Sequence, residues 1–374
     1  MVLLTIRCFM RFSTCKLYFG VYMKANYSNE IDKKNILKLR ELCSELPDYC
    51  KDFFRGIEPR TQSRTRIAYA YDLKVFFTFL TSELSAFRGF TSIRDIPLEA
   101  LETIKPRDLE EYMEYLKIRK TKDGEIFNKE LGIKRKMASL KSFYKYFYKH
   151  DLLSQNPTEK VSMPKIRDKE IIRLDIDEVA LMLDTVESGD ELTKRQKLYH
   201  DKNETRDFAI ITLLLGTGIR VSECVGINID DIDFKNYAIR ITRKGGKEST
   251  IYFSEEVAAA LSDYMSLRRE LIPASGHENA FFLSLQQKRL SVRSVENLVK
   301  KYAKIVTPLK RITPHKLRST YGTNLYRETG DIYLVADVLG HSDVNTTKKH
   351  YAAIDEDRKR LARNAVKLRD TLEP

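Results

Sequence analysis

The chain carries histidines, arginines and a late tyrosine in short segments whose residue types suit the chemistry of phosphate esters. The segment TPHKLR places His315 and Arg318 three residues apart, just after Pro314, which suits the first turn of a helix. Residues three apart share a helical face, and backbone N–H groups at a helix N-terminus also attract anions. The pair therefore forms a candidate phosphate-binding arrangement. The plain alternative is a capping histidine beside an exposed arginine.

Two further segments hold candidate residues. The segment GTGIRVSEC places Arg220 in a glycine-bounded turn, three residues before Glu223, and an arginine there must reach solvent or bind an anion. In VLGHSDVNTTKKHY, Gly340 would end a helix, His341 follows it, and Tyr351 lies ten residues later. Each has an ordinary alternative. Arg220 could be a surface residue beside a capping glutamate, and most of the 20 tyrosines must serve packing.

Taken together, these residues follow the order R…K…HxxR…H…Y, which resembles the tyrosine recombinase (phage integrase) family. The resemblance spans the C-terminal half through TGIRVSE, RKGGKE, HKLR, LGHS and HYA, and extends more weakly to AYAYDLKVFFTFL and KRKMASLKSFYKYF. It departs from the family in an N-terminal extension, in the segment 185–204, and at Ser319, where many relatives carry another histidine. The residues that match the catalytic set are Arg220, Lys244, His315, Arg318, His341 and Tyr351.

The resemblance implies DNA cleavage and rejoining through a 3′-phosphotyrosyl link, with Tyr351 as the nucleophile. A phosphodiester is anionic, and a planar guanidinium can grip two of its oxygens, which suits Arg220 and Arg318 to a phosphate clamp. Glu223 would orient Arg220. Since one phosphodiester replaces another, no ATP is required.

The proton transfers are also assigned from the resemblance. His315 would act as the base, His341 as a hydrogen-bonding partner of the phosphate, and Lys244 as the acid that protonates the departing 5′ oxygen. Lys247 is the alternative acid, because both lysines flank the same Gly-Gly turn. Because arginine and lysine would supply the positive charge, we expect no metal and no cofactor.

The composition favours a DNA-binding protein of about two domains. The chain has 374 residues, of which 42% are apolar, and its 66 Lys and Arg against 53 Asp and Glu give a net charge of +13. Such a surplus favours a polyanionic partner. Five cysteines without metal-type pairs predict a reducing, cytoplasmic location, associated with the nucleoid. No apolar stretch reaches the roughly 18 residues of a membrane helix.

The N-terminal half reads as helices joined by polar turns. Apolar spacing predicts helices over 63–80, with Ser63 or Thr65 as its cap, over 108–119 and over 132–150. The last of these carries a basic face, which is either a solvated surface or a surface that tracks DNA phosphates. The candidate DNA contacts are Arg66, Lys134, Arg135, Lys136, Lys141 and Lys145, together with Lys247 in the hairpin.

The C-terminal half begins after a proline-marked strip. A capped helix is expected near residue 174, a surface loop over 185–204, and a β-hairpin from 237–242 and 249–253 around Gly245-Gly246. The fold class is therefore mainly α with a small β-hairpin or sheet. The expected parts are an extension, disordered or a mis-called start (1–29), a helical, SAM-like core-binding domain (30–163), a linker (164–173) and a catalytic domain ending in an exchange helix (174–374).

The layout resembles the single-protein Xer recombinases, the XerS type, which resolve chromosome dimers. The implied partners are a double-stranded DNA recombination site and three further copies of the chain, as a homotetramer on two sites, with a DNA translocase as a candidate regulator and no membrane. The C-terminal helix would dock on a neighbouring protomer, or fold back on its own domain. Alternatives are an integrase of a phage or mobile element, a type IB topoisomerase-like enzyme and, less favoured, a non-catalytic DNA-binding protein.

Overall fold

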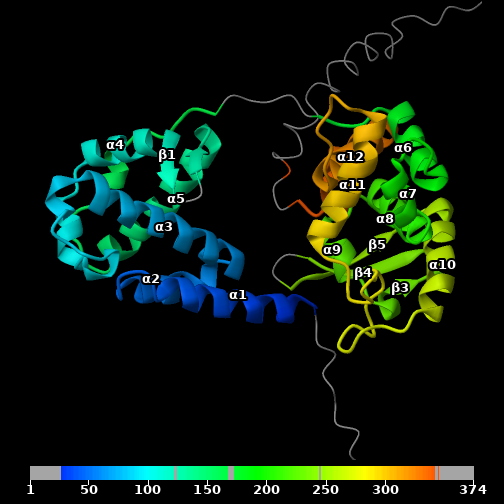
Figure 1. The fold of residues 1–374 in the computed structure, drawn as a ribbon, viewed down its shortest axis with the longest axis horizontal. Coiled ribbons are helices and arrows are strands. Elements are labelled where there is room, and N and C mark those ends of the chain that lie inside the picture. The colour runs from blue at the N-terminus through cyan, green and yellow to red at the C-terminus, as the bar shows by residue number, and fades with distance from the viewer. Residues whose placement is uncertain (1–26, 122–123, 167–171, 244–245, 342–343, 345–374) are drawn as a thin grey trace, which may run out of the picture. The chain divides into compact units, whose positions relative to one another are not determined.

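The computed structural model describes residues 27–121, 124–166, 172–243, 246–341 and 344, and the chain divides into two compact units, 1–168 and 169–374 (Figure 1). The predicted linker contains the point of division. The mainly helical fold class with small sheets is confirmed. Among the described residues, no helix combines the length and apolar character needed to cross a bilayer.

The N-terminal unit is a helical bundle around an aromatic core. Helix α3 packs against α1 and α5, and phenylalanine rings from α2, α3 and α5 meet edge to face, as in the contact between Phe53 and Phe143 at 5.2 Å between ring centres. The predicted helices over 63–80 and 132–150 are confirmed as α3 and α5. The bounds are α1 Tyr27–Cys43, α2 Cys50–Ile57, α3 Ser63–Glu83, α4 Pro106–Lys117 and α5 Glu130–Lys149.

Two local predictions in this unit were wrong. The helix expected to continue to residue 119 ends at Lys117, and a two-stranded hairpin follows, β1 (Ile118–Thr121) and β2 (Gly124–Phe127). The sequence signal was the dipeptide Asp123-Gly124, which is common at hairpins, and Gly124, the first residue of β2, has a φ of +119°. Neither Ser63 nor Thr65 caps α3, because Gln62 takes the N-cap position.

A buried carboxylate joins α3 to the basic face of α5. Asp72, 2% exposed, accepts two hydrogen bonds from the Arg135 guanidinium, at 2.6 and 2.7 Å, and one from Lys136 Nζ at 3.1 Å. A buried carboxylate is tolerated when it is paired and fully hydrogen-bonded. Two cations of the predicted DNA-contacting face therefore hold the bundle together.

The C-terminal unit surrounds one almost fully buried helix. Helix α8, whose sequence FAIITLLLGT is apolar on nearly every side, packs against α6, α10 and α12 (Figure 1). The helices are α6 Ile176–Ser188, α7 Lys194–His200, α8 Glu204–Thr217, α9 Val221–Gly226, α10 Glu255–Glu270, α11 Val292–Val306, α12 Pro314–Thr329 and α13 Ile332–Leu339.

The sheet of this unit is antiparallel, in the order β3-β4-β5. The predicted hairpin is confirmed as β4 (Ala238–Thr242) and β5 (Glu248–Tyr252), with Ala238 opposite Tyr252. A short third strand that was not expected, β3 (Ile232–Asp233), pairs with β4. Gly246, in the turn, has a φ of +79°, a conformation that glycine adopts without strain.

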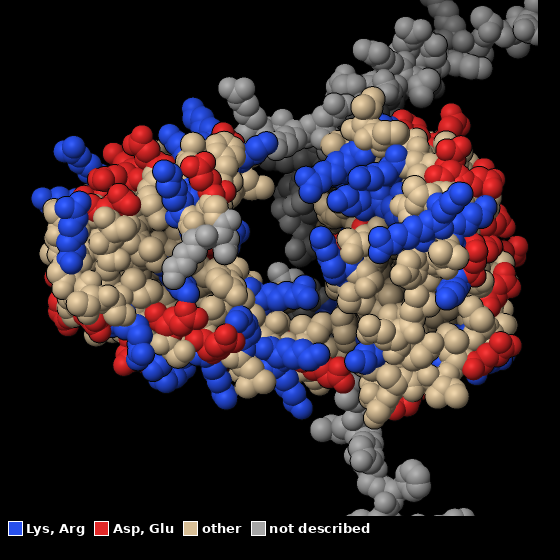
Figure 2. All heavy atoms as spheres, in the orientation of Figure 1, with Lys and Arg blue, Asp and Glu red and all other residues tan. Residues whose placement is uncertain are grey.

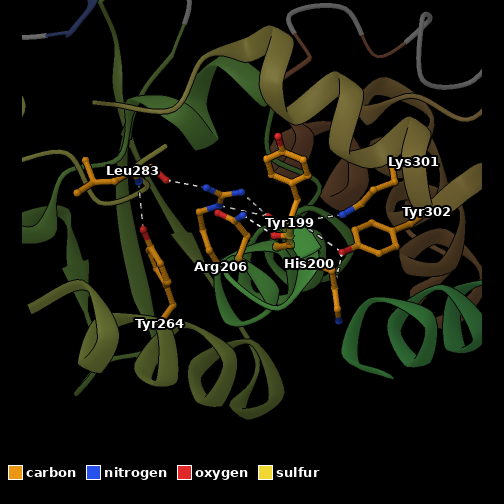
Figure 3. Close-up of polar contacts among 9 residues, drawn as sticks. Tyr199, His200, Arg206, Tyr264, Leu283, Lys301 and Tyr302 are labelled. Carbon is orange, nitrogen blue, oxygen red and sulfur yellow. Dashed lines mark hydrogen bonds and ion pairs between the residues drawn. The ribbon is translucent and has the colours of Figure 1, made fainter. Parts of the chain in front are cut away.

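The surface loop predicted for 185–204 was wrong, because α6 continues to Ser188 and α7 occupies Lys194–His200. The error has a physical cause: the segment is anchored by buried polar groups and not by an apolar stripe. His200, 2% exposed, contacts Tyr302 with its Nδ1 atom 3.0 Å from the phenolic oxygen, and Tyr302 in turn donates to Asp207 at 3.4 Å (Figure 3).

Asp207 is the centre of this network. Arg206 Nη2 lies 2.7 Å and Lys301 Nζ 3.3 Å from its two carboxylate oxygens, and Arg206 also donates to the carbonyl of Leu283 (Figure 3). Burial raises the pKa of the Tyr302 phenol and lowers the pKa of Lys301, whose charge the Asp207 carboxylate supports. The network ties α7, α8 and α11 together.

The pairing of Asp72 generates a stability prediction. Asp72→Ala leaves Lys136, whose side chain is 11% exposed, without its counter-ion, so the free energy of unfolding of the N-terminal unit should fall by about 3 kcal/mol in urea titrations. The matched control is Asp52→Ala, which removes an exposed pair with Arg55 and should cost less than about 1 kcal/mol. If both variants lose the same free energy of unfolding, the burial of Asp72 does not explain its contribution to stability.

Candidate active site

Two arginines from distant parts of the chain meet at the end of α13. Arg318, in α12 and 5% exposed, donates through Nη2 to the carbonyl of Leu339 and through Nη1 to that of Gly218 at 2.6 Å. Arg220, at the start of α9, donates through Nη2 to the carbonyl of Gly340 at 3.1 Å. The two guanidinium groups therefore bind the carbonyls of consecutive residues, and they converge on one place.

The local structure explains why these carbonyls attract cations. The last four carbonyls of a helix have no partner within it, and the helix dipole places partial negative charge there. Gly340 ends α13 in the left-handed conformation, with a φ of +61°, and Gly218 ends α8 in the same way, with a φ of +62°. The sequence prediction that Gly340 ends a helix is confirmed. The arginines supply the partners that each helix end lacks.

Arg220 is held from its other side by Glu223. The buried carboxylate accepts a hydrogen bond from the backbone N–H of Arg220 at 2.7 Å and another from its Nη1 at 2.8 Å. The Arg220 side chain remains 36% exposed. Its orientation is thus fixed from two directions, by Glu223 and by Gly340, while part of the guanidinium stays open to an incoming ligand.

Cys224, the neighbour of Glu223, is no rival nucleophile. The side chain is fully buried, and burial raises the pKa of its thiol to about 12. The thiol is therefore protonated at neutral pH, whereas the thiolate is the reactive form.

The two candidate histidines lie on or next to the elements that hold the arginine pair. His315 lies one helical turn before Arg318 in the first turn of α12, on an exposed part of the helix, and Pro314 takes the first helical position as predicted. His341 directly follows Gly340, and its backbone N–H donates to the carbonyl of Ala336 at 2.9 Å. The positions of both histidines are set by the elements that hold the arginines.

The remaining catalytic candidates, Lys244 and Tyr351, lie outside the described residues, as does the predicted exchange helix. The alternative acid, Lys247, is described and exposed at the start of the segment that enters β5. The structure thus brings together Arg220, Glu223, Arg318 and the turn before His341, with His315 on the same helix as Arg318.

The predicted DNA contacts fall into two groups. Arg66 is buried and pairs with Glu58 at 2.9 Å, and Arg135 and Lys136 are engaged by Asp72, so these three have structural partners inside the N-terminal unit. Contact with DNA stays a prediction for the whole set. On α5, Lys134, Lys141 and Lys145 are exposed, and so is Arg135, although it is paired with Asp72.

Basic side chains also gather on the C-terminal unit. Figure 2 shows Lys and Arg over the region that α11 and α12 occupy in Figure 1. Arg293, Lys300 and Lys304 are exposed on α11. These residues were not among the predicted contacts, because α11 contains none of the sequence motifs. Only the structure shows that its basic residues share a face.

Sequence reasoning also missed Arg243. The guanidinium of this last described residue before Lys244 donates to the carbonyls of Asp337 at 3.3 Å and Val338 at 2.9 Å. Its partners lie 94 and 95 residues away, so no local spacing could reveal them. With Arg243, three arginines bind the end of α13.

Comparisons with known proteins identify the family of the chain. The model of the Phage integrase family matches residues 172–358. The chain is 35% identical over 327 residues to the tyrosine recombinase XerC of Caldanaerobacter subterraneus subsp. tengcongensis, which covers 84% of each protein. It is 30% identical over 350 residues to the tyrosine recombinase XerS of Lactococcus lactis subsp. cremoris, covering 87% of this chain and 96% of that protein.

Solved structures share the fold. The Tn1549 transposon integrase in complex with a circular intermediate DNA aligns with a TM-score of 0.60 and 21% identity, over 84% of this chain and 98% of that one. The XerH recombinase bound to its difH substrate aligns with a TM-score of 0.55 and 20% identity, over 79% and 78%. The family match and the XerC relative define the class as that of the integrase-type DNA-cleaving and -rejoining enzymes. The chain belongs to the phage integrase family and is a tyrosine recombinase of Xer type.

The hydrogen bonds of Glu223 generate a prediction for activity. Glu223→Ala removes both carboxylate contacts to Arg220, and a misplaced guanidinium should slow single-turnover cleavage of a DNA site by about 100-fold with little change in DNA affinity. Glu223→Gln keeps one acceptor oxygen and should lose less. Glu256→Ala, at an exposed position in the first turn of α10, is the control. Wild-type cleavage by Glu223→Ala would exclude an orienting role.

Proposed function

We propose that this chain cuts and rejoins double-stranded DNA at a specific site through a 3′-phosphotyrosyl intermediate, with Tyr351 as the nucleophile. The observation that carries the proposal is the convergence of Arg220 and Arg318, which bind the carbonyls of the consecutive residues Leu339 and Gly340. Two guanidinium groups so close together create a strongly anion-attracting place on the protein. The match to the Phage integrase family supports the same chemistry.

The arginines act by stabilising charge. A phosphodiester repels nucleophiles through its negative charge, and attack raises the charge on its non-bridging oxygens further. Arg220 and Arg318 are already oriented by carbonyl partners and, for Arg220, by Glu223, so little reorganisation is needed when the phosphate enters. This preorganised positive charge lowers the energy of the transition state more than that of the bound substrate.

Proton transfers complete the reaction. The Tyr351 phenol, with an ordinary pKa near 10, passes its proton to His315 as its oxygen forms the new bond to phosphorus. The bond from phosphorus to the 5′ oxygen breaks, and Lys244 donates a proton to that oxygen, with Lys247 as the alternative donor. His341 donates a hydrogen bond to the phosphate. Rejoining reverses each step, with the 5′ hydroxyl of the partner strand as nucleophile.

Because the arginines and a lysine supply the positive charge, cleavage should not depend on a divalent metal. Incubation with excess EDTA is expected to leave the rate of covalent adduct formation on a DNA site unchanged. The measurement is a time course of adduct on a denaturing gel, with and without chelator. A rate that collapses in EDTA and returns with Mg²⁺ would contradict this prediction.

The biological role proposed is that of a Xer recombinase, the resolution of chromosome dimers by a homotetramer on two DNA sites, in the cytoplasm at the nucleoid. Its support is the identity to XerC and XerS proteins along most of the chain. A DNA translocase is the proposed regulator. A solitary chromosomal gene beside a dif-like site supports this role, whereas flanking genes of a mobile element would assign the chain to an integrase.

The nucleophile can be tested directly. On a nicked suicide substrate, which releases the cut end, the wild-type chain should form an adduct that resists SDS, and Tyr351→Phe should form none. Tyr333→Phe is the matched control, because this tyrosine in α13 is 71% exposed and has no assigned role. An adduct formed by Tyr351→Phe would overturn the assignment. Strand exchange between two labelled duplexes separates recombination from topoisomerase activity.

A further inference from the structure

Arg243 connects the β4–β5 hairpin to the helix end that holds the phosphate clamp. Its Nη1 and Nη2 atoms donate to the carbonyls of Asp337 and Val338, at 3.3 and 2.9 Å. The guanidinium also lies directly against Gly340, where an added Cβ would overlap it. Gly340 therefore suits its left-handed backbone, and a Cβ there would also displace the Arg243 guanidinium from its present position.

The same residue closes the hairpin loop. The backbone N–H of Arg243 donates to the carbonyl of Lys247 at 2.8 Å, and its carbonyl accepts from the N–H of Gly246 at 3.1 Å. These two bonds join the ends of the hairpin at Arg243 and Lys247, and Gly246 between them has a φ of +79°. Lys244 follows Arg243 directly, so their Cα atoms are about 3.8 Å apart. The anchored arginine thereby fixes one end of the loop that carries the proposed acid.

The three arginines bind consecutive carbonyls at the end of α13. Arg243 binds the carbonyls of residues 337 and 338, Arg318 that of residue 339 and Arg220 that of residue 340. The proposed acid must reach the 5′ oxygen of the same phosphate whose other oxygens Arg220 and Arg318 hold. A fixed relation between the hairpin and the clamp is therefore needed, and the carbonyls of α13 supply it.

We propose that Arg243 is a positioning residue for proton donation to the leaving 5′ oxygen. It acts through its carbonyl partners, by fixing the hairpin, and with it Lys244, to the end of α13. The inference rests on the proposed function. It goes further in assigning a role to a residue outside the catalytic set.

The test uses a substrate that needs no acid. Replacing the bridging 5′ oxygen of the scissile phosphate by sulfur lets the electron pair of the broken P–S bond leave as a thiolate, which departs without a proton. Arg243→Ala should cleave the ordinary substrate about 100-fold more slowly than wild type, the lower range of general acid catalysis. On the sulfur substrate its rate should come within a few-fold of the wild-type rate. Lys244→Ala should show the same pattern.

Control variants define the alternatives. Arg220→Ala, which weakens the clamp, should remain slow on both substrates, and Arg240→Ala, an exposed arginine of β4 bound to Asp231, should match wild type on both. Arg243→Lys, which keeps one cationic donor, should lose less than Arg243→Ala on the ordinary substrate. Rapid cleavage of the sulfur substrate by Arg243→Ala also shows that the variant is folded.

Two results would overturn the inference. If Arg243→Ala cleaves the sulfur substrate as slowly as the oxygen substrate, Arg243 acts through the clamp or through stability. If Arg243→Ala cleaves the ordinary substrate at the wild-type rate, the contacts of Arg243 with α13 are dispensable. Failure of the proposed function has a different signature. In that case wild type forms no adduct on either substrate, or Tyr351→Phe still forms one.

Discussion

The end of α13 is the constraint around which the site is arranged. A buried guanidinium needs hydrogen-bond acceptors, and a carboxylate would satisfy it while cancelling the charge that a phosphate must meet. Peptide carbonyls satisfy Arg318 without that loss, since they are dipoles with no net charge. Arg220, the more exposed of the pair, also has a carboxylate partner in Glu223. The helix end thus orients positive charge and leaves most of it available.

The elements around the end of α13 hold it in a fixed position. Arg318 and His315 lie on α12, which packs on the buried helix α8, and Gly218 at the end of α8 offers a further carbonyl to Arg318. A side chain at Gly218 would collide with Tyr321 and Leu339. The glycines in the motifs are therefore packing constraints as well as turn residues, which explains why arginine and glycine occur together there.

Much of this could be predicted from sequence where the signal is local. The glycine end of α13, the proline start of α12 and the apolar stripe of α5 follow from short-range backbone and periodicity rules, and each prediction was confirmed. The failures concern polar anchors between distant residues. Helix α7 depends on His200 meeting Tyr302, and Arg243 on carbonyls some 95 residues away, which no periodicity encodes.

Charge was the feature that sequence described least well. In the sequence, the basic residues of α5 cannot be told apart. In the structure, Arg135 and Lys136 neutralise the buried Asp72, while Lys141 and Lys145 are exposed to solvent. The difference arises on α3, because a single carboxylate there selects which cations become structural. Counting lysines and arginines therefore overstates the surface available to phosphates. A cation bound to a buried carboxylate can contribute to DNA binding only through the charge that remains after pairing.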